Sequence, residues 1–250
     1  ADLEGPGIFG TITLSGGTIN YTQDTSQYID LRATLTISSG TFNLYGGSGD
    51  CWFAFVDPAT LNMSGGTLDI HDQGIYVSNS YAFTDNVTAG TIRTVKSFSN
   101  HRADVNFSGG TLEFYGGTDA SLINTVGSNL YNVLINKSTT RGEDDRALAD
   151  YEIDRLGNRI PITRSNTITA SGPLDINGSF TIQAGFFIAP AEIYVAGNWA
   201  NQVGPGAFNE GTGTVIFDGA GHQYCNYNEN FNAITINKTV IKNRIAYPSL

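Results

Sequence analysis

A short phrase that recurs through the N-terminal half of the chain constrains the fold more than any other feature. Each copy has a glycine, a threonine, and then alternating apolar and polar residues. The Gly-Thr steps fall at Gly17-Thr18, Gly40-Thr41, Gly66-Thr67, Gly90-Thr91 and Gly110-Thr111, at intervals of 23, 26, 24 and 20 residues. Alternation is typical of a strand with one buried face. A period in the low twenties indicates one coil of a β-solenoid, whose core becomes continuous only when coils stack.

The glycines fit corners between strands, because glycine adopts positive φ and tolerates close approach of a neighbouring coil. The branched threonine that follows favours extended backbone. A sandwich of hairpins also has short strands and glycine turns, but hairpin proteins rarely repeat one phrase at the length of a coil. We therefore predict an all-β chain, a parallel β-solenoid (β-helix) of about ten irregular coils forming a single domain over residues 1–250, with two or three short strands per coil.

Composition excludes several classes of protein. Charged residues make up 14% of the chain, against roughly 25% in an average soluble protein. Apolar residues make up 40%, which excludes a disordered chain. The net charge of −10 argues against nucleic acid as a partner, because phosphate binding needs clustered Lys and Arg. No apolar run reaches the roughly 18 residues of a membrane span, and a chain that begins with Ala1 is expected to be a mature exported product.

A second, longer-range repeat links the two halves. Residues 111–114 are echoed by residues 214–217, and residues 132–138 by residues 232–239, about 100 positions further on. The string over residues 213–239 resembles the repeats of large secreted surface proteins from anaerobic bacteria, which are similar to parallel β-helices and adhesin passenger domains. The resemblance implies a fold and an exported, cell-surface location. It implies no chemistry, and no catalytic residue is transferred from it.

Residues 139–159 break the repeat and concentrate charge. They are predicted to form an inserted loop or short helix that projects from the solenoid wall. It is either a solvated excursion or a contact loop for another subunit or a ligand. The residues proposed for such a contact are Arg141, Glu143, Asp144, Asp145 and Arg146. A cation site is weakly indicated, since the acidic residues lack the alternating spacing of a calcium loop.

Catalytic and metal-binding patterns are sparse. The histidines His71, His101 and His222 have no metal-ligand spacing, so no metal site and no cofactor are predicted. The best enzyme hypothesis is a polysaccharide lyase, which would use basic residues on one sheet face. The basic residues considered for it are Arg93, Lys96, His101 and Arg102. A glycosidase pair would have to come from Asp69, Asp72, Asp104 and Glu113, and sequence does not fix their separation. Scattered surface residues explain both sets more simply, and we predict no enzyme.

Aromatic residues are numerous, with 12 Tyr and 14 Phe. The cluster at residues 52–55 and the pair Tyr224 and Tyr227 suit either sugar-stacking platforms or aromatic fillers of the solenoid bore, and we favour the fillers. The function expected is an extracellular structural or adhesive protein that assembles with itself into a filament, sheath or surface layer. The alternative is a carbohydrate-active β-helix that binds or cleaves acidic polysaccharide.

Self-association into a filament, by end-to-end stacking or by lateral strand addition, is expected because solenoid ends expose unpaired strand edges. Residues 8–14 are apolar at alternate positions and have no charge that would protect such an edge. Cys51 and Cys225 are about seven coils apart, on the order of 35 Å at about 4.8 Å per coil, while a disulfide needs Cα atoms within about 7 Å. A straight solenoid therefore excludes an intrachain bond. Three alternatives remain open: two buried free thiols, an intersubunit Cys51–Cys225 bond, and an intrachain bond in a chain that doubles back.

Overall fold

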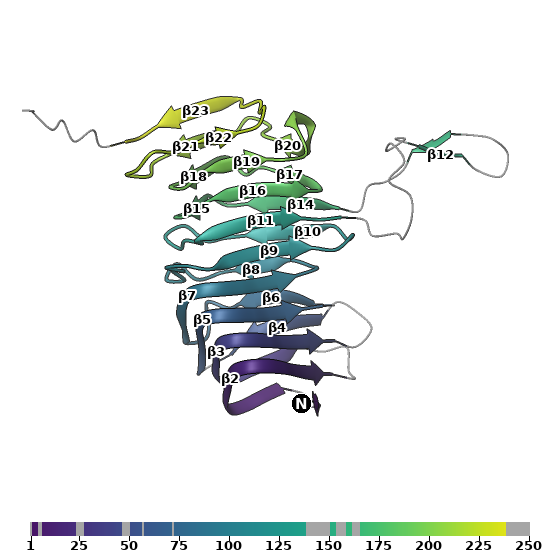
Figure 1. Cartoon of the computed structure of the whole chain (residues 1–250), viewed down its shortest axis with the longest axis vertical. Coiled ribbons are helices and arrows are strands. Elements are labelled where there is room, and N and C mark those ends of the chain that lie inside the picture. The colour runs from purple at the N-terminus through teal and green to yellow at the C-terminus, as the bar shows by residue number, and fades with distance from the viewer. Residues whose placement is uncertain are drawn as a thin grey trace, which may run out of the picture.

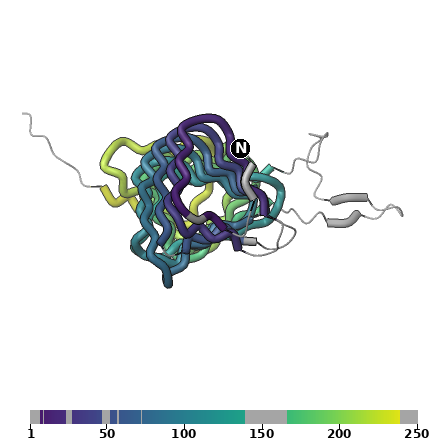
Figure 2. Tube along the Cα trace, turned by 90° about the horizontal axis from the view of Figure 1, so that it is seen from below, coloured from purple at the N-terminus to yellow at the C-terminus, as the bar shows by residue number. Residues whose placement is uncertain are grey.

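The computed structural model describes residues 2–4, 7–23, 28–46, 51–56, 58–71, 73–138, 151–153, 159–161 and 166–238. It is a parallel β-solenoid of about eight turns, close to the number predicted, which confirms the fold class (Figure 1). The only helix among the described residues is the 3-10 turn η1 (Pro205–Ala207). Seen along the stack, the coils superpose around one central space (Figure 2). Buried apolar side chains fill this space, which we call the bore.

Registered strands divide each coil into three faces, which the chain follows in the order C, A, B. Face A contains the middle of β2 (Gly7–Thr22) and of β3 (Ile29–Tyr45), the first parts of β5 (Ala59–Ile70) and β7 (Phe83–Thr94), then β15 (Leu174–Ile176), β18 (Glu192–Val195), β21 (Thr214–Phe217) and β23 (Ala233–Ile236). Between β7 and β15, the described part of face A has no regular strand and is formed by two isolated parallel bridges, Asn106–Asn129 and Leu130–Ile176.

Face B contains β1 (Asp2–Glu4), the last parts of β2, β3, β5 and β7, then β9 (Thr111–Tyr115), β11 (Asn132–Asn136), β16 (Phe180–Ala184), β19 (Trp199–Asn201) and β22 (Cys225–Asn226). Face C contains the starts of β2 and β3, then β4 (Cys51–Phe55), β6 (Gln73–Val77), β8 (Phe98–Asn100), β10 (Ala120–Ile123), β14 (Thr167–Ser171), β17 (Phe186–Ile188) and β20 (Phe208–Asn209).

The Gly-Thr steps form the corner between faces A and B. Their threonines, from Thr18 to Thr111, are stacked in register through five successive coils. Gly66 has a φ of +68°, and a Cβ there would lie 2.7 Å from the carbonyl oxygen of Gly40 in the coil below. The corner therefore needs glycine for two reasons, its backbone conformation and the close approach of coils.

Alternate residues of each strand fill the bore. In the N-terminal half these are mainly aliphatic, such as Leu35 and Leu61, which are 0% and 1% exposed. Toward the C-terminus a cluster of aromatic side chains joins the aliphatic ones, and Trp199 is surrounded by three rings. Its ring centroid lies 4.6 Å from that of Phe180, 4.8 Å from that of Phe208 and 5.3 Å from that of Phe231. Above it, the Glu229 carboxylate accepts hydrogen bonds from Trp199 Nε1 (3.2 Å) and Asn201 Nδ2 (2.7 Å).

The two copies of the longer-range repeat lie on different faces of the solenoid. Residues 111–114 belong to β9, which pairs with β11 on face B, whereas residues 214–217 form β21, which pairs with β23 on face A. The repeated unit is thus a stacked pair of strands, and it is not tied to one face. The predicted insertion lies between β11 and β14. Of it, the structure describes only β12 (Tyr151–Ile153) and Arg159 of β13 (Arg159–Pro161), which pair antiparallel beside the stack in Figure 1.

Candidate functional site

A hollow of about 220 Å³ lies on the outer surface of face C. Register explains it, because Asp30, Ala54 and Tyr76 are aligned on three successive coils. The methyl group of Ala54 is the smallest of the three side chains and forms the floor. We call this site the face C hollow. Its lining residues are Tyr28, Asp30, Arg32, Ala54, Phe55, Val56, Tyr76, Ser78 and Tyr81.

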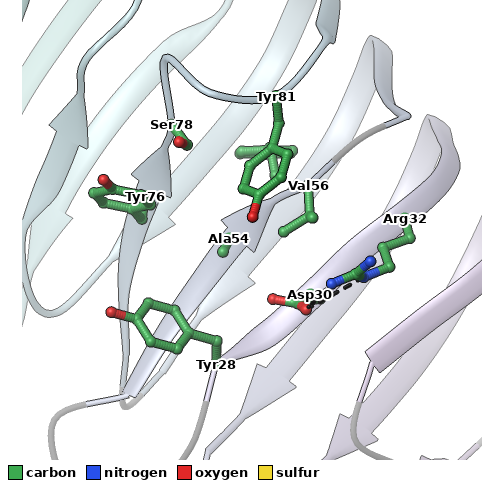
Figure 3. A pocket seen from close by; sticks show the side chains of 9 residues that line it. Tyr28, Asp30, Arg32, Ala54, Val56, Tyr76, Ser78 and Tyr81 are labelled. Carbon is green, nitrogen blue, oxygen red and sulfur yellow. Dashed lines mark hydrogen bonds and ion pairs between the residues drawn. The ribbon is translucent and has the colours of Figure 1, made fainter.

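Three tyrosines surround the floor (Figure 3). Tyr28 and Tyr81 are 54% and 42% exposed, which is high for aromatic side chains. Tyr76 is partly buried, and its ring continues into an aromatic strip that crosses coils. Its centroid lies 6.0 Å from that of Trp52 and 5.2 Å from that of His101.

An ion pair forms one wall of the hollow. The guanidinium of Arg32 donates to Asp30 Oδ2 from Nη2 (3.0 Å) and from Nε (3.3 Å). The loop that carries Tyr81 is held from the next coil, because Arg102 Nη1 donates to the Tyr81 carbonyl oxygen. Arg102 also donates to Asp104 (2.7 Å), and this hydrogen bond lowers the pKa of the Asp104 carboxyl. The wall and the loop are therefore fixed before any ligand arrives.

A second cluster of charges lies on face B. Arg93 Nη1 contacts Asp69 at 3.0 Å and Arg93 Nε contacts Glu113 at 2.8 Å, since the three residues are aligned on successive coils. The Tyr115 ring covers the Arg93 guanidinium, 4.2 Å from its centroid. The Tyr115 hydroxyl donates to Asp69 (2.6 Å) and lies 3.2 Å from Nδ1 of His71.

This cluster brings together residues that the sequence only suggested. Asp69 and Glu113, two of the four carboxylates considered for a glycosidase pair, lie on either side of Arg93. Asp104 is elsewhere, paired with Arg102, and Asp72 lies outside the described residues. Because Arg93 occupies the space between the two carboxylates and bonds to both, the arrangement works as a ladder of ion pairs between coils.

The four basic residues considered for a lyase are split between faces. Arg93 is on face B with its carboxylate partners, and Lys96 follows the same strand. His101 and Arg102 follow β8 on face C, and Arg102 is paired with Asp104. His71 lies on face B and His222 in the loop between β21 and β22. Across the described ranges, no three His, Cys, Asp or Glu side chains form a group that could hold a metal ion.

The remaining predicted residues have separate outcomes. In the cluster at residues 52–55, Phe53 and Phe55 fill the bore at 0% and 3% exposed, while Trp52 lies on the outside of face C. Tyr224 and Tyr227 are 61% and 62% exposed near the C-terminal end. The proposed contact residues Arg141, Glu143, Asp144, Asp145 and Arg146 lie outside the described residues.

The two cysteines lie in different strands of different faces. Cys225 is a free, exposed thiol on β22. Partial desolvation of the thiol raises the pKa of Cys225, and the nearby Glu229 carboxylate raises it further. Cys51 is in β4, and face C takes six strand steps from β4 to β20, about 29 Å at about 4.8 Å per step. The separation again excludes an intrachain bond, and the intersubunit bond stays a prediction.

Comparison with known protein families, with curated proteins and with solved structures finds no match for this chain. Within the part of the chain that the structure describes, no helix has the length and apolar character needed to cross a bilayer.

Proposed function

We propose that this protein is an extracellular structural or adhesive β-solenoid that stacks end to end into a filament. The observation that supports this function is which face of the coil holds the first described strand and which face holds the last. The described chain begins on face B with β1 and ends on face A with β23, at opposite ends of the stack (Figure 1). Since the chain follows faces in the order C, A, B, the strand after β23 belongs on face B. A second copy on the C-terminal end supplies β1 at that position and continues the spiral.

The two end strands of face A have matching patterns. β23 reads Ala233-Ile234-Thr235-Ile236, and the face A part of β2 reads Thr11-Ile12-Thr13-Leu14. Ile234 and Ile236 follow the inward positions of β21 but are 51% and 71% exposed, because no described strand lies beyond them. In the coil below, the inward Val215 is 2% exposed. Placing β2 of a second copy on β23 would align Ile234 with Ile12 and Ile236 with Leu14.

Among the described residues, the two end strands of face A lack two of the usual protections of an edge. Natural edge strands are blocked by charged side chains, proline or bulges, and residues 11–14 and 233–236 have no charge and no proline. A head-to-tail contact that does not close a ring generates an open filament. The low charge content is consistent with a structural protein, and the extracellular location rests on the sequence alone.

End-to-end stacking also bears on the predicted intersubunit disulfide. Cys225 on β22 would meet β1 of the next copy, while Cys51 of that copy lies about three strand steps further on, roughly 14 Å along the axis. This exceeds the limit of about 7 Å between Cα atoms. A Cys51–Cys225 bond between copies would therefore need a lateral contact.

Sedimentation and negative-stain microscopy test the proposal on the full chain. We expect the average mass to rise with concentration, and filaments one solenoid wide at high concentration. Replacing Ile234 and Ile236 together with Lys should leave a monomer, because the charges would be buried at the junction. Val126→Lys, at a position 68% exposed, is the matched control and should assemble normally. A wild-type protein that stays monomeric, or a double variant that assembles like wild type, would overturn the proposal.

A further inference from the structure

The face C hollow combines features that self-assembly does not use, since it lies on the side of the stack and not at an end. We propose that it is a binding site for a neutral saccharide, with a sugar ring held against the tyrosines and hydrogen-bonded to Asp30 and Arg32. The site is independent of filament formation, and a monomer would retain it.

The tyrosines favour a sugar over other small ligands. A pyranose ring has one face of C–H groups and an edge of hydroxyls, and tyrosine offers an apolar ring with one polar group. Tyr28 and Tyr81 are about half exposed, so stacking a sugar on them removes apolar surface from water. A fully apolar ligand would remove water from the ion pair and offer no hydrogen bond in return, which is unfavourable.

The ion pair also offers groups for recognition. Both described hydrogen bonds of Arg32 end on Asp30 Oδ2. Among the described residues, Oδ1 of Asp30 and Nη1 of Arg32 make no hydrogen bond, which leaves a planar acceptor beside a planar donor. Two neighbouring hydroxyls of a sugar can donate to one and accept from the other.

Charge selects a neutral saccharide over an acidic one. The Arg32 charge is already compensated by Asp30, and the nearby Arg102 is paired with Asp104. The whole chain has a net charge of −10, which repels polyanions. This differs from the acidic polysaccharide considered on sequence grounds, because the basic residues behind that hypothesis are split between faces.

Size and shape indicate how a longer ligand would lie. The volume of about 220 Å³ is below the roughly 300–1,000 Å³ of sites for drug-sized ligands, so the hollow fits one sugar ring. Further rings would follow the strip of Trp52, Tyr76 and His101, which crosses three coils along the solenoid axis. The Arg102 contact that holds Tyr81 reduces the entropy lost on binding.

Affinity gel electrophoresis tests the site. The gels would contain neutral polysaccharides (galactomannan, hydroxyethyl cellulose, a β-1,3-glucan) or acidic ones (polygalacturonate, alginate), and titration calorimetry with oligosaccharides of any retarding polymer would give Kd. We expect a neutral polymer to retard the protein. Ala54→Phe, which fills the floor, and Tyr81→Ala, which removes a stacking ring, should each weaken binding about tenfold or more. Tyr131→Ala is the control, since Tyr131 is 36% exposed away from the hollow.

Circular dichroism of each variant checks that the fold is intact, and Tyr81→Ala keeps the test valid if Ala54→Phe fails to fold. Three results would overturn the proposal: no retardation by any of the neutral polymers, preference for the acidic polymers, or equal binding by Tyr81→Ala and Tyr131→Ala.

Discussion

The two halves of the solenoid fill the same bore in different ways. In the N-terminal half, β2, β3, β5 and β7 are 12 to 17 residues long and turn the corner between faces A and B without a break. From β14 onward the strands are two to five residues long, and each corner interrupts them. The long strands enclose mainly aliphatic side chains, whereas the short strands surround the aromatic cluster of Trp199.

The contrast shows where each half is sensitive. Coils approach closely at stacked glycine corners in both halves, at Gly66 over Gly40 and at Gly197 over Gly178, so added backbone volume is a threat throughout the stack. In the C-terminal half, few hydrogen bonds join each pair of strands, so stability depends more on contacts between large side chains. The following four predictions test this difference, beginning with the largest effect.

Removing the indole ring of Trp199 should destabilise the C-terminal half more than any other change considered. Trp199 is 0% exposed and contacts three aromatic rings. Trp199→Ala should lower the free energy of unfolding by about 3–5 kcal/mol, measured by guanidinium denaturation. Phe42→Leu in the aliphatic half is the comparison and should cost less than about 1.5 kcal/mol, because leucine suits its neighbours. Similar losses for both would show that the aromatic cluster has no special role.

Replacing a corner glycine should lower stability more at an internal corner, where a neighbouring coil lies close, than at the terminal corner. Gly17 and Gly66 have similar φ values of +74° and +68°, but of the two only Gly66 has atoms of a neighbouring coil within 4 Å of the position that a Cβ would occupy. Gly17→Ala should cost about 1–2 kcal/mol from backbone strain alone. Gly66→Ala should cost about 1 kcal/mol more than that, since the new methyl group meets the Gly40 carbonyl. Thermal unfolding of the two variants separates these contributions, and equal costs would remove close approach as a cause.

The ion-pair ladder on face B joins coils within the regular half. Arg93→Met leaves Asp69 and Glu113, which are 5% and 8% exposed, without their shared cation. We expect a loss of about 2 kcal/mol in urea denaturation, because unpaired carboxylates remain in a partly buried site. Arg32→Met removes a more exposed pair and should cost below about 1 kcal/mol. A smaller loss for Arg93→Met than for Arg32→Met would contradict the role of the ladder.

The smallest effect is a pH dependence at Lys137, where the two halves meet. Lys137 is fully buried and donates to the carbonyl oxygens of Val95 and Tyr115, and burial lowers its pKa from 10.5 to about 8. Between these values the unfolded chain binds more protons than the folded one, so stability rises with pH from about 8 to about 10.5. Below pH 8 the amine is charged in both states and its burial is fully unfavourable.

Between pH 7.5 and 9, wild type should gain about 1 kcal/mol relative to Lys137→Met, measured by urea denaturation at each pH. The variant provides the baseline, because all other titrating groups are common to both proteins. A difference between the two proteins that stays constant with pH would show that the Lys137 pKa is not depressed.

Much of the fold could be predicted because one motif marks one position in every coil. The threonines of the Gly-Thr phrase are in register from Thr18 to Thr111, so the spacing of the phrase measures the coil directly. The later echo between residues 111–114 and 214–217 predicts another repeat but not the change of face. Faces depend on how many residues each corner uses. The corner glycines Gly178, Gly197 and Gly219 of the C-terminal half are each followed by a different residue, so no Gly-Thr phrase marks them.

The face C hollow could not be predicted, for a related reason. It depends on Asp30, Ala54 and Tyr76 being aligned, and the intervals of 24 and 22 residues between them become visible only when register is known. A comparison of residues 28–32 with residues 52–56 and 74–78 at that spacing would have revealed a small residue between larger ones. The face B ladder is partly visible in the sequence, since Asp69 and Glu113 are candidates there, but Arg93 belongs to a different hypothesis.

The parallel register has a mechanical consequence. Hydrogen bonds between coils run along the axis, so a force that pulls the two chain ends apart loads the bonds of the terminal coil first and peels it from the stack. The pairing interval of about 23 residues, seen between Asn20 and Asn43, means that each peeled coil releases about 80 Å of extended chain. A single chain held by its two ends would therefore lengthen in steps of one coil while the remaining coils stay folded.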